Sequence, residues 1–190
     1  MTKRNLVFLD FDGVLNSIRS VTAYQTAGHN KVAWDAEGLD EVAVRLVRRL
    51  CEEAPAEVVI SSAWRKFYPL EQLTKFLEAK GWPNPPIIGQ TVSLDLSTMY
   101  GKSWGFRGNE VGHFLAKFVE KGNELGNWVV LDDSKDFHYE ETSLGGFFSK
   151  QPIVNTDDMV GFSFVNFYDA LKILNPEHEL LQQLEYYYQK

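Results

Sequence analysis

The sequence contains a single cysteine, Cys51, among its 190 residues. One cysteine cannot form an internal disulfide bond, and it cannot supply a zinc site built from several cysteines. Long hydrophobic runs are also missing, because no apolar stretch approaches the roughly 20 residues that span a bilayer. The first residues carry no signal-peptide pattern. These absences predict a cytoplasmic protein that has no membrane partner.

Positive charge is scarce in this sequence. Lysine and arginine number 19 against 26 aspartate and glutamate residues, which gives a formal net charge of -7. Broad, non-specific binding to nucleic acid depends on many basic side chains that neutralise phosphates, so this class of function is not expected. The charge leaves room for a compact basic pocket that grips one phosphate. Internal repeats and low-complexity tracts are absent as well, and the length suits one domain.

Short apolar runs recur along the chain, and several of them end in a polar residue. The clearest runs cover residues 5–10, 58–61 and 128–132, and weaker candidates cover 86–88 and 152–154. Runs that are apolar on both faces suit the central strands of a parallel sheet. The sequence therefore predicts buried strands whose carboxyl ends carry polar side chains.

Helical periodicity fills the segments between these runs. Apolar residues spaced by three and four predict helices over residues 39–50, 70–77, 111–118 and 167–174. Strands that alternate with helices predict an α/β fold. Its sheet is expected to be doubly wound and mainly parallel, with helices on both faces.

Two stretches, residues 17–36 and 89–106, do not fit this alternation. Both are rich in polar, glycine and aromatic residues and are long for plain connections, so each is expected to form a small flap or cap. Asn175-Pro176 resembles the N-cap and first residue of a last helix. The sequence therefore predicts one domain over residues 1–175 and a C-terminal helix over 176–190 that packs on it.

The chemistry is expected where the strands end, because ligands of open α/β sheets bind beyond the carboxyl ends of the strands. Acidic side chains gathered there would repel one another unless a cation lay among them. Oxygen ligands with room for water suit Mg²⁺. One of the carboxylates would then be free to attack phosphorus. The polar pairs at the three clearest strand ends are Asp10 with Asp12, Ser61 with Ser62, and Asp132 with Asp133.

The order of these residues resembles that of the haloacid dehalogenase (HAD) superfamily, whose members are aspartate-nucleophile phosphohydrolases. The first strand ends in an Asp-x-Asp-Gly motif at residues 10–13, a serine ends a later strand, a basic residue precedes a helix, and two aspartates close the next strong strand. Residues 61–65 (SSAWR), 107–111 (RGNEV) and 131–137 (LDDSKDF) are most similar to the HAD phosphatase domains associated with Swiss Army Knife RNA-repair proteins. This resemblance implies a HAD-like Rossmannoid fold with a minimal cap.

The resemblance also implies roles for the acidic residues. Asp10 would be the nucleophile and a metal ligand, and it would carry the phosphoryl group as an aspartyl-phosphate. Asp12 would protonate the leaving oxygen and later activate water, while its backbone carbonyl binds Mg²⁺. Gly13 would permit the tight turn that brings backbone N–H groups towards the phosphate. Asp132 and Asp133 would complete the metal site.

Further residues would bind the phosphate by the same resemblance. Ser61 would donate to a non-bridging oxygen with help from the Ser62 amide, and Arg107 would offset charge in the transition state. The family usually has lysine where this chain offers Arg107, although arginine can also fork onto phosphate oxygens. Lys102 is the alternative for this position. Arg65, just past Ser61, is a further candidate for substrate binding.

These residues together predict a Mg²⁺-dependent phosphomonoesterase. The inserts are too short for a large cap, so an open site is expected, and such a site tolerates a bulky substrate such as a nucleic-acid end. The acidic net charge favours a small nucleotide instead. The expected substrate is therefore a phosphate on a nucleotide or a nucleic-acid terminus. The alternatives are a small-metabolite phosphatase, a phospho-receiver domain and a non-catalytic HAD-like binding module. A receiver usually closes its first strand with the acidic pair, whereas the pair at residues 132–133 comes late in this chain.

Overall fold

The computed structural model describes residues 2–28, 36–93, 107–134 and 152–188. They form a five-stranded sheet in the order β3-β2-β1-β4-β5, and every pair of neighbouring strands is parallel. The strands are β1 (Arg4–Leu9), β2 (Ala56–Ile60), β3 (Ile87–Gln90), β4 (Leu125–Asp132) and β5 (Ile153–Asn155). This arrangement confirms the predicted α/β fold with a parallel sheet, including the two weaker strand candidates, which are β3 and β5.

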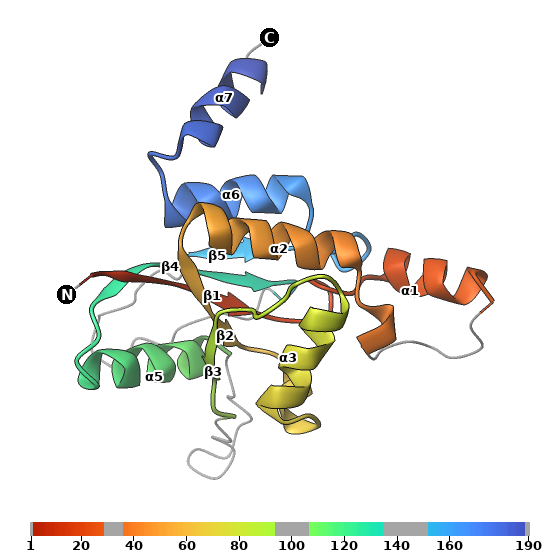
Figure 1. Ribbon diagram of the computed structural model, residues 1–190, viewed down its shortest axis with the longest axis horizontal. Helices are drawn as coiled ribbons and strands as arrows, with labels where there is room; N and C mark the ends of the chain where they lie inside the picture. The colour runs from red at the N-terminus through yellow and green to blue at the C-terminus, as the bar shows by residue number, and fades with distance from the viewer. Residues whose placement is uncertain (1, 29–35, 94–106, 135–151, 189–190) are drawn as a thin grey trace.

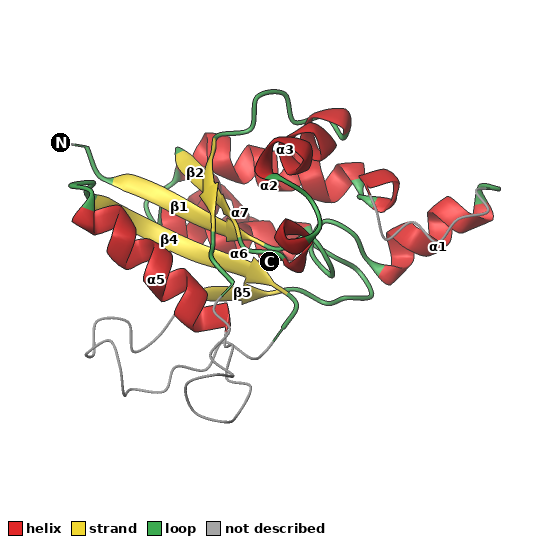
Figure 2. Cartoon of the chain, turned by 90° about the horizontal axis from the view of Figure 1, so that it is seen from below, coloured by secondary structure: helices red, strands yellow, loops and turns green. Residues whose placement is uncertain are grey.

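Helices cover both faces of the sheet (Figures 1 and 2). The helix α5 lies on one face, and α2 and α6 lie on the other. None of the described helices combines the length and apolar composition that crossing a bilayer requires. The helices are α1 (Ile18–Thr26), α2 (Glu41–Glu53), α3 (Leu70–Ala79), α5 (Arg107–Glu120), α6 (Phe164–Leu174) and α7 (Glu179–Tyr188), with short 3-10 turns η1 (Ala36–Gly38) and η2 (Ala63–Lys66).

Alternate residues of each central strand enter two separate hydrophobic clusters. In β1, Leu6 and Phe8 pack with residues of α5, whereas Val7 and Leu9 pack with α2, α3 and α6. Successive side chains of a strand point to opposite faces, so a strand buried on both faces must be apolar throughout. This explains the continuous apolar run, and it fixes the end of β1 firmly inside the molecule.

The insert predicted over residues 17–36 is not a plain loop, because it contains the helix α1. The side chain of Ser17 accepts a hydrogen bond from the backbone N–H of Ser20, which caps the helix start. Only Val21 of this helix is buried, so the apolar periodicity that identifies most helices is missing. Figure 1 shows α1 projecting away from the sheet. Of the second insert, residues 89–90 belong to β3, and residues 94–106 lie outside the described residues.

The prediction that Asn175 caps the start of the last helix is wrong. Asn175 instead ends α6, because its backbone N–H donates to the carbonyl of Leu171 at 2.7 Å. The chain then turns, and α7 begins only at Glu179, where the ring Nδ1 of His178 accepts from the N–H of Leu180 at 3.2 Å. Leu181 of this last helix is buried in the core cluster on the α6 side of the sheet.

Candidate active site

The parallel register aligns a row of polar residues across the carboxyl edge of the sheet. Thr91, Ser61, Asp10 and Asp132 follow or end β3, β2, β1 and β4 in their spatial order. The backbone N–H groups of the first three continue the ladder to the neighbouring strand at 2.8–3.1 Å. All four residues are buried, and residues paired across parallel strands point to the same face. The sheet therefore brings residues from distant parts of the sequence into one line.

Three carboxylates meet at this edge. Asp10, Asp132 and Asp133 each offer an oxygen, and these atoms lie within 4.8 Å of one another. Backbone N–H groups hold two of the side chains, since Phe11 donates to Asp10 at 2.7 Å and Ser134 donates to Asp132 at 2.8 Å. An ionised carboxylate has about four acceptor positions, so these bonds leave capacity for a cation. The all-oxygen donor set fits Mg²⁺.

Arg107 lies against the same carboxylates. It is the first residue of α5, and its Nη1 donates to Asp10 Oδ2 at 2.5 Å and also to Asp132 Oδ2. Burial lowers the pKa of the guanidinium, but the charges of Asp10, Asp132 and Asp133 outweigh burial and raise this pKa. The predicted basic residue is therefore adjacent to the predicted nucleophile. Lys102, the alternative, lies outside the described residues.

Asp10, Asp132 and Asp133, which we call the acidic cluster, repel one another unless further positive charge lies nearby. Burial, and then repulsion from Asp10, raise the pKa of Asp132 to about 8, although Arg107 opposes the shift. Burial and the charge of Asp10 also raise the pKa of Asp133. Neighbouring acids whose pKa values are both raised in this way are typical of a site that gains a cation.

The raised pKa of Asp132 predicts how the stabilisation of the protein by Mg²⁺ depends on pH. Folded, metal-free Asp132 keeps its proton up to about pH 8, whereas the unfolded chain loses it near the ordinary value of 3.8. The folded state binds the extra proton in this window, so the stability of the metal-free protein falls as pH rises through it. Because a cation binds the deprotonated carboxylate, the melting-temperature gain from Mg²⁺ should grow up to about pH 8 and then level off. Differential scanning fluorimetry with and without Mg²⁺ measures this gain.

The control for this experiment is Asp132→Asn, which should lose both the gain and its pH dependence. A gain of equal size at about pH 5 and about pH 9 in the unaltered protein would contradict the assignment of Asp132 as a metal ligand.

Asp12 is not part of the acidic cluster, because two nitrogen donors bind its carboxylate instead. The side-chain amide of Asn16 donates to Asp12 Oδ1 at 2.9 Å, and the indole N–H of Trp64 donates to Asp12 Oδ2 at 2.8 Å. Its carboxylate is not one of the three that form the candidate metal group. The sequence analysis missed Asn16 and Trp64, since neither residue type signals such a contact by spacing alone.

Gly13 allows the backbone to approach the acidic cluster. Its φ is 68°, a conformation that L side chains rarely adopt, and an added Cβ would overlap the carboxyl group of Asp133. The prediction of a tight turn is confirmed. However, the N–H of Gly13 donates to the side-chain oxygen of Asn16 at 3.1 Å, so in this structure it serves the turn itself. Its contact with a phosphate stays a prediction.

Ser61 has a buried hydroxyl with no hydrogen-bond partner among the described residues. Ser61 is completely buried, and the hydroxyl of its neighbour in the polar row, Thr91, also has no partner in the described part of the chain. Leaving the Ser61 hydroxyl unpaired costs about 1–3 kcal/mol, which a ligand bound beside Asp10 would recover. Thr91, like Asn16 and Trp64, was not singled out by the sequence analysis.

Ser62 and Arg65 have structural contacts. The Ser62 side chain accepts from the N–H of Trp64 at 3.3 Å and caps η2. Arg65 forms a buried ion pair with Glu110 of α5 and also donates to the Ser62 carbonyl. The pair joins η2 to the helix that begins with Arg107. Contact of Ser62 or Arg65 with substrate remains a prediction.

The comparison with known families agrees with this geometry. The profile of the HAD domain in Swiss Army Knife RNA repair proteins matches residues 6–167 of the chain. The chain belongs to this family. The match begins within β1 and ends in the first turn of α6, so it includes all residues of the acidic cluster. Membership in this HAD family supports a HAD-type phosphatase. No curated protein and no solved structure matches the chain.

Proposed function

We propose that this HAD-family protein is a Mg²⁺-dependent phosphomonoesterase that works through an aspartyl-phosphate on Asp10. The observation that carries the proposal is the group formed by the buried Asp10 and Asp132 with the partly buried Asp133. Its carboxylate oxygens lie within 4.8 Å of one another, and Arg107 is bonded to the first two residues. When bound there, Mg²⁺ would neutralise the carboxylates and polarise a phosphate oxygen.

In the first half of the reaction, a carboxylate oxygen of Asp10 bonds to phosphorus while the bond from phosphorus to the leaving oxygen breaks. Asp12 gives its proton to that oxygen. Arg107, already in contact with Asp10, stabilises the negative charge that develops on the phosphoryl group. Ser61 directly follows β2, the strand next to β1, and its hydroxyl has no partner within the described ranges. This hydroxyl donates to a phosphoryl oxygen.

In the second half, Asp12 accepts a proton from water as the water oxygen bonds to phosphorus. The bond between phosphorus and Asp10 breaks, which returns the carboxylate and releases inorganic phosphate. Asn16 and Trp64 hold both oxygens of Asp12 and so fix its orientation in both halves. A fixed acid and base at one position contributes typically about 10²- to 10⁴-fold to rate.

A pocket beside Asp12 favours a leaving group that carries an aromatic ring, such as a nucleoside with its base. Its volume is about 530 Å³, and Trp64, Phe67 and Tyr68 line it together with Asp12. Phe67 is 77% exposed, which leaves its ring free to stack. A nucleobase offers a flat face to such rings, and each stacked base contributes about 1–3 kcal/mol. These features support a phosphate on a nucleotide or a nucleic-acid terminus as the substrate.

A phosphate-release screen with and without Mg²⁺ tests this proposal. It should compare 5′- and 3′-nucleotides, phosphorylated oligonucleotide ends and small sugar phosphates. We expect Mg²⁺-dependent release, fastest from substrates that carry a base. Preference for sugar phosphates would point to a small-metabolite phosphatase, and a lasting phosphorylated protein would point to a phospho-receiver. No release from any compound would point to a non-catalytic binding module.

The Ser61→Ala variant separates activity from stability. Loss of one donor to the phosphoryl group should lower kcat by about 10²-fold. The melting temperature should hold or rise, because the hydroxyl that is removed has no partner among the described residues. Thr91→Val is the matched control: it removes a similar hydroxyl two strands from Asp10, about 10 Å away, and should keep its activity. Assays of phosphate release and thermal melts check both variants, and a destabilised, fully active Ser61→Ala protein would contradict the role.

A further inference from the structure

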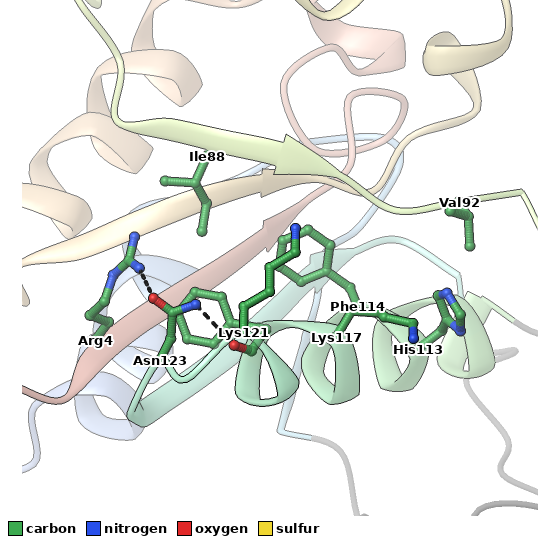
Figure 3. Close-up of a pocket in the computed structure, with 9 residues that line it drawn as sticks. Arg4, Ile88, Val92, His113, Phe114, Lys117, Lys121 and Asn123 are labelled. Carbon is green, nitrogen blue, oxygen red and sulfur yellow. Dashed lines mark hydrogen bonds between the residues drawn. The ribbon is translucent and has the colours of Figure 1, made fainter.

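A second pocket lies between α5 and the edge strand β3, on the face of the sheet opposite α2 and α6 (Figure 3). Its volume is about 270 Å³. Ile88, Val92 and Phe114 give it an apolar wall. Val92 and His113 lie at one end, beside the carboxyl edge of the sheet, and Arg4 lies at the other. We call this feature the α5 groove.

Basic side chains surround the α5 groove. Arg4, His113, Lys117 and Lys121 line it, and none of the described residues in its lining carries a carboxylate. In a chain with a formal net charge of -7, this is a marked local excess of positive charge. The combination of cationic rim and apolar wall suits a ligand with both an anionic and a flat apolar part.

Two of these cations are available to a ligand. Lys117 pairs with Glu120 at 2.7 Å, but both side chains are more than half exposed, and such pairs contribute little. Lys121 forms no ion pair with another residue in the described part of the chain. Arg4, by contrast, is held by Glu57 and Asn123. The two lysines are therefore the groups to test.

The spacing along α5 relates the groove to the catalytic edge. Arg107, which contacts Asp10, is the first residue of the helix, and Lys117 and Lys121 follow on one side of the groove. At about 1.5 Å per residue, Lys117 lies about 15 Å along the helix axis from Arg107, and Lys121, which directly follows the last residue of α5, lies about 21 Å from it. A stacked strand that rises about 3.4 Å per nucleotide covers that distance in about four to six nucleotides.

We propose that the α5 groove binds the phosphodiester backbone of a single-stranded nucleic acid whose phosphorylated end lies at Asp10. This inference rests on the proposed function and adds a second contact region to it. Lys117 and Lys121 neutralise backbone phosphates, and a base lies against Phe114 and Val92. An acidic peptide would also pair with the basic side chains of the groove. A nucleic-acid strand, however, also explains why the groove starts beside the edge of the sheet where a terminal phosphate would react.

Binding tests the groove without any need for catalysis. The probe is a fluorescein-labelled, unphosphorylated eight-nucleotide strand, as RNA and as DNA, measured by fluorescence anisotropy at several KCl concentrations. The variant Lys117→Gln/Lys121→Gln should bind roughly tenfold more weakly than the unaltered protein at about 0.1 M salt. The slope of log Kd against log salt should fall by about 1.4, because each contact to a single strand contributes about 0.7.

The matched control is Lys75→Gln/Lys172→Gln. It removes one lysine paired within its helix and one exposed lysine of α6 on the other face of the sheet. Its affinity and salt slope should equal those of the unaltered protein. Equal affinity of the groove variant and the control would overturn the proposal, as would stronger competition by polyglutamate than by an unlabelled strand.

Phosphorylated oligonucleotides of increasing length then test whether the α5 groove contributes to activity. In the unaltered protein, kcat/KM for phosphorylated oligonucleotides should rise until the strand has about six nucleotides, and in the groove variant it should be independent of length. Mononucleotide hydrolysis should be equal in both. Strand binding without any hydrolysis would refute the proposed phosphatase function but support binding by the α5 groove. Hydrolysis that never depends on strand length would refute only the proposed binding by the groove.

Discussion

Replacing Asp10 with asparagine is expected to lower phosphate release by about 10⁴-fold or more. Asparagine keeps the shape of the side chain and can still accept the hydrogen bond from the N–H of Phe11. It cannot form the bond to phosphorus, and the reaction loses its covalent route. The variant should remain folded, because the strand β1 that positions it is buried on both faces by apolar residues. Phosphate release with Mg²⁺ and a phosphomonoester measures the loss.

The control for this variant is Asp169→Asn, which changes an exposed acid of α6 outside the acidic cluster. It should retain full activity. Circular dichroism and a thermal melt of both variants separate loss of chemistry from loss of fold. Undiminished turnover by the Asp10→Asn protein would refute its assignment as the nucleophile.

Replacing Asp12 with asparagine should have an effect that depends on the leaving group. An alkyl phosphate needs a proton on its leaving oxygen, so kcat should fall by about 10³- to 10⁴-fold. An aryl phosphate leaves without a proton, so its first step should survive while water attack on the aspartyl-phosphate slows. The expected result is a burst of phenol in proportion to enzyme, followed by slow turnover, measured by stopped-flow absorbance.

The contacts of Asp12 supply a control for this experiment. Trp64→Phe keeps an aromatic ring in η2 but removes the N–H that donates to Asp12 at 2.8 Å. Trp64→Phe should lower the rates for alkyl and aryl phosphates by similar factors, and both losses should be smaller than the loss of alkyl-phosphate turnover in Asp12→Asn. No burst of phenol is expected. Equal losses for alkyl and aryl phosphates in the Asp12→Asn protein would argue against an acid and base role for this residue.

The parts of the site that could be predicted from the sequence are those set by strand ends. A run buried on both faces, such as residues 5–10, must be a central strand, and parallel strands deliver their carboxyl ends to one edge. Asp10 and Asp132 had to meet once those strands were paired. Arg107 could be predicted from its position at the start of a helix and from the family resemblance.

The parts that could not be predicted depend on contacts between distant side chains. Trp64 donates to Asp12 although the two residues are 52 positions apart in the sequence, and Arg65 pairs with Glu110 although these are 45 positions apart. No local spacing encodes either contact. The helix α1 was missed because it buries only one of its side chains, and Asn175 was misassigned because an asparagine before proline can end one helix as readily as it can open the next.

The most direct test of the account is to trap the covalent intermediate. The protein is mixed with substrate and Mg²⁺, quenched in acid and reduced with borohydride, which converts an aspartyl-phosphate to homoserine, and the peptide that spans β1 is sequenced by mass spectrometry. The account predicts homoserine at position 10, and none in protein that has not met substrate. Rapid phosphate release with an unmodified position 10, or with the modification on another carboxylate, would contradict it.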